Sequence, residues 1–207
     1  MKAWESNIRK VEPYVPGEQP KVQDVIKLNT NENPYGPSEN VRKAMEAIDI
    51  DRCRLYPDPD VTKLVKSIAD YYGMDNNQVF VGVGSDDVLS MCFLTFFNGK
   101  KPVLFPDITY SFYSVWADLY RIPYECQKLD EDFKLVKEDY YKENGGVIFP
   151  NPNAPTGIYE DLSVVEDIIA HNQDVIVIVD EAYIDFAGRS ALELIDKYDN
   201  LIVVQTF

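Results

Sequence analysis

The chain has 207 residues, of which 45% are hydrophobic and 27% charged, a composition that argues against a disordered protein and allows one domain with a real core or two small ones. Its 20 basic and 35 acidic residues give a net charge of -15, so its surface repels the phosphates of nucleic acids. No apolar run approaches the roughly 18 residues that span a membrane, and the first residues lack the apolar core of a signal peptide. We therefore expect a cytoplasmic protein that binds neither nucleic acid nor membrane.

Residues 1–30 are expected to form an irregular arm. Pro13, Pro16 and Pro20 fall too close together for a long helix. A polar turn cluster rich in Asn, Pro and Gly, LNTNENPYGPS, follows at residues 28–38.

Two amphipathic helices are predicted next. The first covers residues 38–48, with Ser38 as a possible N-cap and apolar side chains along one face. The second covers residues 58–73 and is expected to end at Gly73.

After residue 73 the pattern alternates between short apolar runs and helical stretches. Such a succession predicts an α/β domain with a mostly parallel sheet flanked by helices. The expected strands are residues 78–84, 102–106, 124–129, 146–150, 174–180 and 200–207, and helical stretches lie between several of them at 85–98, 111–120 and 162–172.

The three cysteines and the single histidine restrict the chemistry. Cys53, Cys92 and Cys126 show neither metal-ligand spacing nor an even count, so we expect reduced and mostly buried thiols. With His171 as the one histidine, a histidine-based metal site and a Ser-His-Asp triad are nearly excluded. His171 comes late in a predicted helix, where a position at the surface or at the helix end is expected.

The first polar junction joins the strand expected at 78–84 to a helix. Gly82 and Gly84 would let a ligand approach the backbone closely, and free N–H groups around Ser85–Asp87 could hold a phosphate at the helix start. A plain tight turn is an equally good interpretation. The motif lacks the third glycine of a dinucleotide fingerprint and the lysine of a P-loop, and the acidic side chains at 86 and 87 would have to point away from a phosphate.

Two further junctions carry possible ligand contacts. Tyr110 follows the strand at 102–106, where an aromatic ring could stack on a planar ligand or simply pack against the protein. Asn153 lies in the proline-rich loop FPNPNAPTGIY, where its amide could donate to a ligand oxygen or belong to an ordinary turn.

A fourth junction ends the most apolar strand on charged residues. The run VIVIVDEAYIDF passes from buried valines and isoleucines to Asp180, Glu181 and Tyr183. Asp180 could cap the following turn. However, all four junctions follow strands, and a parallel sheet gathers such junctions into one crevice. A phosphate cradle, an aromatic ring, an amide and a buried carboxylate suit a phosphorylated planar heterocycle.

Six motifs in order carry a resemblance to a known family: NTNENPYGPS, LYPDP, GVGSDDVL, PDITYSFY, NPNAPTG and VDEAYIDF. From about Asn29 onward the chain resembles the fold-type I pyridoxal-phosphate aminotransferases, and within them the branch that acts on histidinol phosphate. The resemblance implies an incomplete fold-type I large domain at residues 31–207, with residues 1–30 as an arm or part of a small domain. It implies transfer of an amino group from L-histidinol phosphate to 2-oxoglutarate in histidine biosynthesis.

The resemblance also implies roles for the residues of the first two junctions. Gly84, Ser85 and Asp86 would bind the phosphate of pyridoxal 5'-phosphate, mainly through backbone N–H groups. Tyr110 would stack on the pyridine ring.

At the remaining junctions the resemblance implies contacts with the pyridine nitrogen and the phenolic oxygen. Asp180 would pair with the nitrogen and favour its protonated form, since opposite charges attract strongly in a low dielectric. The protonated ring then serves as an electron sink. Tyr183 would donate to the phenolic oxygen. The family usually carries Asn directly before Pro-Thr-Gly, where this chain has Ala154, so Asn153 is expected to take that contact.

Two tyrosines nearer the amino terminus are assigned by the resemblance alone. Tyr56 would reach the cofactor phosphate of a neighbouring subunit, which implies a functional homodimer. Tyr35 would lie near the phosphate of the substrate.

The family's Schiff-base lysine comes just after a strand equivalent to 200–207, and no residue of this chain is assigned to it. We therefore expect these 207 residues alone to be inactive and marginally stable, with an exposed edge at 78–84. Alternatives are another fold-type I enzyme, such as an aromatic aminotransferase or a threonine-phosphate decarboxylase-like protein, or a non-catalytic relative acting as a binding module. An unrelated α/β nucleotide-binding domain is disfavoured by the missing phosphate motifs.

Overall fold

The computed structural model describes residues 2–12 and 26–207, and its contacts divide the chain into two units. The first consists of Met1–Tyr14 with Gly82–Phe207, and the second of Val15–Val81. The prolines at 13, 16 and 20, on which the expected arm rests, lie outside the described residues. The predicted boundary at residue 30 stays a prediction.

The second unit contains the two helices expected from the apolar periodicity. Helix α1 covers Glu39–Glu46 and helix α2 covers Thr62–Tyr72, with the 3-10 turns η2 (Ile50–Arg54) and η3 (Asn76–Gln78) after them. Ser38 occupies the N-cap position of α1 but makes no side-chain capping bond. Gly73 ends α2 with φ of 71°, a left-handed conformation that glycine adopts without strain.

The first unit is built on a parallel five-stranded sheet, which confirms the predicted fold class. The strand order is β2-β1-β3-β4-β5, and every neighbouring pair is parallel. The strands are β1 (Val103–Pro106), β2 (Tyr124–Gln127), β3 (Gly146–Pro150), β4 (Val177–Asp180) and β5 (Leu201–Val204). Three of them, β1, β3 and β4, are buried along their whole length, which explains their continuous apolar sequences.

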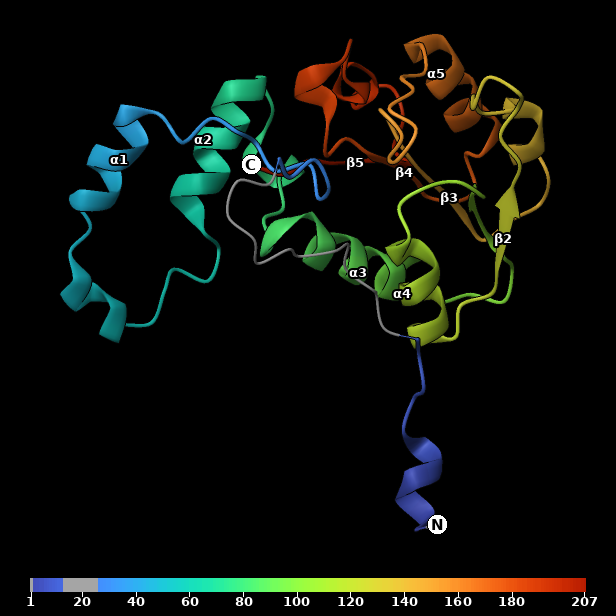
Figure 1. Ribbon diagram of the computed structural model, residues 1–207, viewed down its shortest axis with the longest axis horizontal. Coiled ribbons are helices and arrows are strands. Elements are labelled where there is room, and N and C mark those ends of the chain that lie inside the picture. Colours follow the sequence, from blue (N-terminus) through green and yellow to red (C-terminus); the bar gives the residue numbers. More distant parts are fainter. Residues whose placement is uncertain (1, 13–25) are drawn as a thin grey trace. The chain divides into compact units, whose positions relative to one another are not determined.

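Helices cover both faces of this sheet (Figure 1). Helices α3 (Gly84–Phe96) and α4 (Phe112–Tyr120) lie on one face and α5 (Leu162–His171) on the other. Short 3-10 turns complete the unit: η1 (Ala3–Asn7), η4 (Lys137–Tyr140), η5 (Ile184–Phe186) and η6 (Ala191–Leu194). Since side chains alternate between faces along a strand, Ile178 packs in the α3/α4 core and Val177 and Val179 pack in the α5 core.

The amino ends of three strands are tied together by buried asparagines. Asn144 donates to the side-chain oxygen of Asn172 at 2.7 Å, and Asn172 donates to the carbonyl of Tyr140 at 3.0 Å. Asn200 donates to the carbonyl of Asn172 at 3.0 Å. The amides of Asn172 and Asn200 satisfy backbone carbonyls at the edge opposite the carboxyl ends of the strands.

The prediction of a strand at residues 78–84 is wrong. Residues 76–78 form η3, residues 79–83 have no strand assignment, and α3 begins at Gly84. Valine and phenylalanine favour strands, but a strand forms only where another strand pairs with its backbone. Among the described residues, none forms a ladder with 79–83. Phe80 and Val83 are accordingly exposed.

The expectation of mostly buried thiols is also wrong. Cys92 is buried in α3, but Cys53 and Cys126 are exposed. Burial raises the pKa of the Cys92 thiol to about 11, so that thiol stays protonated. Cys126 is exposed because β2 is an edge strand, and cysteine count and spacing carry no information on exposure.

His171 lies in the last turn of α5, as predicted. Its ring stacks on Tyr141 with centroids 3.9 Å apart.

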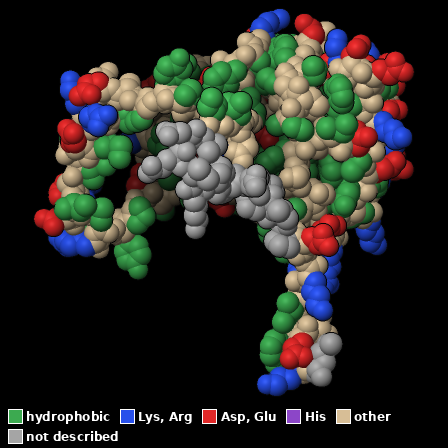
Figure 2. All heavy atoms as spheres, in the orientation of Figure 1, with side chains coloured by type: hydrophobic (Ala, Val, Ile, Leu, Met, Phe, Trp, Pro, Cys, Tyr) green, Lys and Arg blue, Asp and Glu red, His purple; other side chains and the backbone are tan. Residues whose placement is uncertain are grey.

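On the face shown in Figure 2, lysine and arginine side chains are interspersed with acidic and hydrophobic ones. None of the helices in residues 2–12 and 26–207 is long and apolar enough to cross a bilayer.

Candidate functional site

A cavity of about 370 Å³ lies at the carboxyl ends of the strands in the first unit. Its wall is formed by the start of α3 and by the segments that follow β1, β3, β4 and β5. The lining residues are Val83, Gly84, Ser85, Asp86, Tyr110, Pro150, Pro152, Ala154, Asp180, Ala182, Tyr183 and Thr206. The cavity therefore brings together Gly84, Ser85, Asp86, Tyr110, Asp180 and Tyr183, which sequence reasoning had placed at separate junctions.

The amino end of α3 forms one side of this cavity. Gly84 has φ of 81°, in the left-handed region that favours glycine. Gly82 lets its backbone lie close to the Val88 side chain, because a Cβ at this position would be 2.7 Å from that side chain. The first N–H groups of a helix have no partner within the helix, and the helix dipole adds positive potential at this end. The wall at Gly84 and Ser85 is thus suited to an anion.

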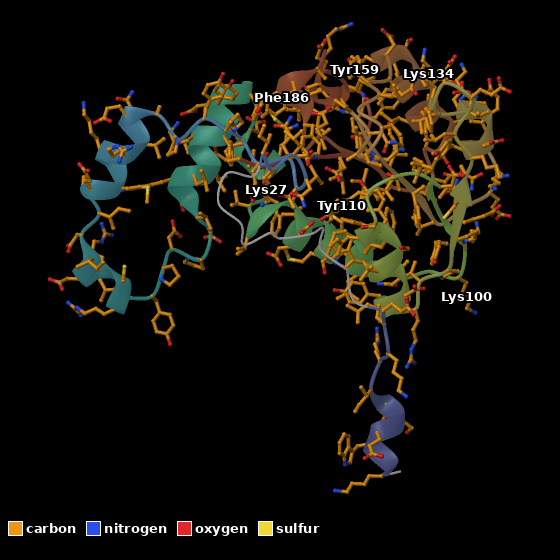
Figure 3. All side chains as sticks on the ribbon, in the orientation of Figure 1. Lys27, Lys100, Tyr110, Lys134, Tyr159 and Phe186 are labelled. Carbon is orange, nitrogen blue, oxygen red and sulfur yellow. The ribbon has the colours of Figure 1, made fainter. Side chains whose placement is uncertain are left out.

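The two acidic side chains in the first turn of α3 are held by the protein. Asp87 accepts a hydrogen bond from the Val83 amide at 3.0 Å, and Asp86 accepts one from the Tyr110 hydroxyl at 2.8 Å. The Asp86 bond links the start of α3 to the segment after β1. Tyr110, labelled in Figure 3, also stacks on Phe112 with ring centroids 5.5 Å apart.

Asp180 is the buried charge of the site. Only 4% of the residue is exposed, and its Oδ2 accepts a hydrogen bond from the Tyr113 hydroxyl at 2.7 Å. Its Oδ1 accepts a longer bond of 3.2 Å from the Ala182 amide. Burial raises the pKa of Asp180 to about 6, against the opposing effect of these two donors. A nearby positive charge would draw that pKa down again and gain binding energy in return.

Tyr113 is a site residue that sequence reasoning missed. It lies in the first turn of α4 and is fully buried, and its ring packs between Phe93, stacked at 6.3 Å, and Phe105, edge-on at 5.8 Å. The available signal was its spacing from Tyr110, because side chains three residues apart near a helix start lie on one side. With 14 tyrosines in the chain, that spacing alone does not single it out.

Asn153 lies behind the cavity wall, and its neighbour Ala154 is on it. The Asn153 amide donates to the carbonyl of Ile108 at 2.9 Å and to the Thr156 hydroxyl at 3.0 Å. Its oxygen accepts from the Thr109 hydroxyl at 3.1 Å. In this structure the side chain therefore joins the loop after β3 to the loop after β1. Its predicted contact with a phenolic oxygen stays a prediction.

Glu181 is a second buried carboxylate, directly after Asp180, and is not part of the cavity wall. It is 1% exposed and accepts hydrogen bonds from the Ser190 hydroxyl and the Ala191 amide, both at 2.6 Å. The Gln205 amide donates to it at 2.8 Å. Burial raises its pKa, and the three donors oppose that rise. Sequence reasoning noted this residue without assigning it a role.

Tyr35 and Tyr56 belong to the second unit, where both are strongly exposed. Each unit is described by itself, so the predicted roles of these tyrosines toward a substrate phosphate and a neighbouring subunit stay predictions.

A family model described as aminotransferase class I and II matches residues 23–207. Among curated proteins, the histidinol-phosphate aminotransferase of Lactococcus lactis subsp. cremoris strain SK11 is 53% identical over 205 residues, which are 99% of this chain and 58% of that protein. The enzyme of the same description from Pseudomonas putida strain W619 is 53% identical over 203 residues, 98% of this chain and 58% of that protein. The chain thus spans somewhat more than half the length of these relatives.

Solved structures show the same fold at low sequence identity. The histidinol-phosphate aminotransferase of Sinorhizobium meliloti in complex with pyridoxal-5'-phosphate matches with a TM-score of 0.76 and 22% identity, covering 86% of this chain and 50% of that one. The L-threonine-O-3-phosphate decarboxylase of Porphyromonas gingivalis matches with a TM-score of 0.70 and 20% identity, covering 81% and 50%. At this level of identity, the structural similarity supports the fold but says nothing about the substrate.

Proposed function

The chain belongs to the aminotransferase class I and II family, and we propose that it supplies the pyridoxal-phosphate site of a histidinol-phosphate aminotransferase. In this proposal the complete enzyme transfers an amino group from L-histidinol phosphate to 2-oxoglutarate. The observation that carries it is the buried carboxylate of Asp180, which shares a cavity with the amino end of α3 and with Tyr110.

The residues of the cavity fit the chemistry of pyridoxal phosphate. The cavity volume of about 370 Å³ lies within the roughly 300–1,000 Å³ of small-molecule sites. The amino end of α3 suits the phosphate, an aromatic side chain suits the flat ring, and a buried acid suits a protonated ring nitrogen. When bound, pyridoxal phosphate supplies the electron sink that amino-group transfer requires.

Each proposed contact can be assigned to one group of the chain. The backbone amides at Gly84, Ser85 and Asp86 bind the phosphate, which leaves the Asp86 carboxylate bonded to Tyr110. Tyr110 covers one face of the ring. The Asp180 carboxylate accepts a hydrogen bond from the protonated pyridine nitrogen and keeps the proton on that nitrogen.

Further parts of the proposal rest on the resemblance and on the curated relatives. Tyr183 donates its hydroxyl to the phenolic oxygen, and Asn153 contacts the same oxygen. Tyr35 binds the substrate phosphate, and Tyr56 reaches the cofactor of a second subunit in a cytoplasmic homodimer. Residues 31–207 form the first part of the large domain, and residues 1–30 form an arm or part of a small domain.

The experiment uses the full-length protein, purified with pyridoxal phosphate and supplied with histidinol phosphate and 2-oxoglutarate. We expect formation of glutamate and the bound cofactor's absorbance. Preferred turnover of aromatic amino acids, or release of carbon dioxide from threonine phosphate, would instead assign the protein to another branch of the family. Cofactor binding without turnover of any amino donor would support a binding module.

A further inference from the structure

The bond between Tyr113 and Asp180 connects two elements that are far apart in sequence. The hydroxyl comes from the first turn of α4 and the carboxylate from the end of β4, and their oxygens are 2.7 Å apart. Both side chains are largely removed from solvent, since Tyr113 is fully buried and Asp180 is 4% exposed. A hydrogen bond to a charged group in such surroundings is stronger than one at the surface.

The position of the Tyr113 hydroxyl is set by its ring. Beyond Phe93 and Phe105, the ring meets Tyr110 edge-on with centroids 5.7 Å apart and Trp116 at 6.5 Å. A tyrosine has only two side-chain torsions, and packing on several sides leaves the ring little freedom. The donor is therefore already in place before a ligand arrives, which is the condition for holding an acceptor in one orientation.

We propose that Tyr113 is a positioning residue for Asp180: it fixes one carboxylate oxygen and keeps the carboxylate negative, so that the protonated pyridine nitrogen of pyridoxal phosphate meets an anion. This inference rests on the proposed function. Tyr113 itself is absent from the cavity wall, so it acts on the cofactor through Asp180.

The other groups around Asp180 make such a donor necessary. Asp86 on α3 and Glu181 at the end of β4 both add negative charge and favour the protonated acid. The strand neighbours paired with Asp180, Pro150 on β3 and Val204 on β5, carry no charge. Tyr113 and the Ala182 amide are the donors that the structure records at the carboxylate, and the Tyr113 bond is the shorter.

Loss of this donor changes the acid in a definite direction. A hydrogen bond to the carboxylate stabilises its charged form, and Tyr113 therefore lowers the pKa of Asp180 against the effect of burial. Without the hydroxyl, Asp180 keeps its proton to a higher pH. A carboxylic acid that already holds a proton cannot pair with a protonated nitrogen. As the pH is lowered, cofactor affinity should therefore begin to fall at a higher pH than in the unmodified protein.

The test compares Tyr113→Phe with Tyr140→Phe in the full-length protein. Tyr140 is a matched control: it is 1% exposed, and its buried hydroxyl has no hydrogen-bond partner among residues 2–12 and 26–207. The first measurement is infrared titration of the cofactor-free protein, in which the band of the protonated Asp180 carboxyl is identified by its loss in Asp180→Asn. We expect Tyr113→Phe to move this titration upward by about one pH unit, and Tyr140→Phe to leave it unchanged.

The second measurement is the Kd for pyridoxal phosphate as a function of pH. Near pH 6 we expect Tyr113→Phe to weaken binding on the order of tenfold, with a smaller effect at higher pH. In an Asp180→Asn background the same substitution should have little further effect, because the two residues act as a unit. An unchanged carboxyl titration in Tyr113→Phe, or equal effects of Tyr113→Phe with and without Asp180, overturns the inference.

Failure of the proposed function gives a different result. If the unmodified protein does not bind pyridoxal phosphate, the proposed function is wrong, while the infrared titration still reports whether Tyr113 controls Asp180. If the unmodified protein binds the cofactor but Tyr113→Phe matches Tyr140→Phe in both measurements, the inference alone is wrong.

Discussion

Asp180 and Glu181 are consecutive buried acids that lie on opposite faces of the sheet and end in different surroundings. Asp180 lies on the α3/α4 face, lines the cavity and has two donors, one of them 3.2 Å away. Glu181 lies on the α5 face, near η6, and has three donors at 2.6 to 2.8 Å. Burial raises the pKa of both.

The difference teaches that burial and a shifted pKa do not by themselves mark a functional acid. Glu181 accepts hydrogen bonds from three of the chain's own donors, which tie Ser190, Ala191 and Gln205 to the end of β4. Asp180 keeps acceptor capacity beside an open cavity, because a carboxylate oxygen can accept more than one bond. We therefore expect substitutions at Asp180 to change activity and those at Glu181 to change stability.

The largest expected effect is that of Asp180→Asn on turnover. We expect a loss of at least about 10²-fold in the full-length enzyme, because the substitution removes the charge that holds the nitrogen's proton. The free energy of unfolding should stay the same or increase at neutral pH, since a neutral amide costs less to bury than an anion. Steady-state kinetics and urea unfolding measure the two quantities. Near-normal turnover would count against the assigned role.

The next effect is on the pH dependence of stability. The pKa of Asp180 is raised from 3.8 to about 6, so the folded state keeps a proton that the unfolded state releases. This contribution to stability is fully present below about pH 4 and is lost as the pH rises toward 6, by up to about 3 kcal/mol. The difference in unfolding free energy between the unmodified cofactor-free protein and Asp180→Asn isolates it. The unfolding free energy of the unmodified protein minus that of Asp180→Asn should therefore fall as the pH rises, and a value that rises with pH in this window contradicts the prediction.

Glu181→Gln should show the opposite division of effects. The new amide places donors against the donors of Ser190, Ala191 or Gln205, and we expect a loss of about 1–3 kcal/mol in unfolding free energy. Turnover per folded molecule should change by less than the loss in Asp180→Asn. The comparison is made at equal fractions of folded protein. A loss of turnover as large as that of Asp180→Asn, with unchanged stability, would remove the distinction between the two acids.

Ser190→Ala is expected to have the smallest effect. Ser190 donates to Glu181 at 2.6 Å and accepts from the Leu192 amide at 3.0 Å as the cap of η6. Its loss should cost about 1 kcal/mol of unfolding free energy. Cofactor affinity should not change, because the donor removed belongs to Glu181. This variant is the counterpart of Tyr113→Phe, which removes one donor from Asp180.

The fold could be predicted from sequence wherever the local pattern and the tertiary environment agree. Runs such as GVIFP and DVIVIVD are apolar throughout because β3 and β4 are buried on both faces. The run at 78–84 has a similar composition, yet no strand forms there. Composition reports a preference for extended backbone, whereas strand formation depends on a partner that lies elsewhere in the chain.

The part of the site that lies at strand ends and helix starts could be predicted from the sequence. Gly84, Tyr110 and Asp180 each follow an apolar run or open a helix, and a parallel sheet brings such positions to one edge. Tyr113 and Thr206 could not be found this way. The role of Tyr113 depends on which way a buried helical side chain points, and that of Thr206 on a cavity whose walls come from five separate segments.

The alignment of β4 with its neighbours decides which acid faces the cavity. Asp180 sits level with Pro150 and Val204, and the amide of Glu181 bonds the carbonyl of Val204 at 2.7 Å. A displacement of β4 by a single residue would turn every side chain to the other face and exchange the two carboxylates. The register of β4 thus determines which carboxylate lines the cavity: after a shift of one residue, the same sequence would place a glutamate where the aspartate now lies.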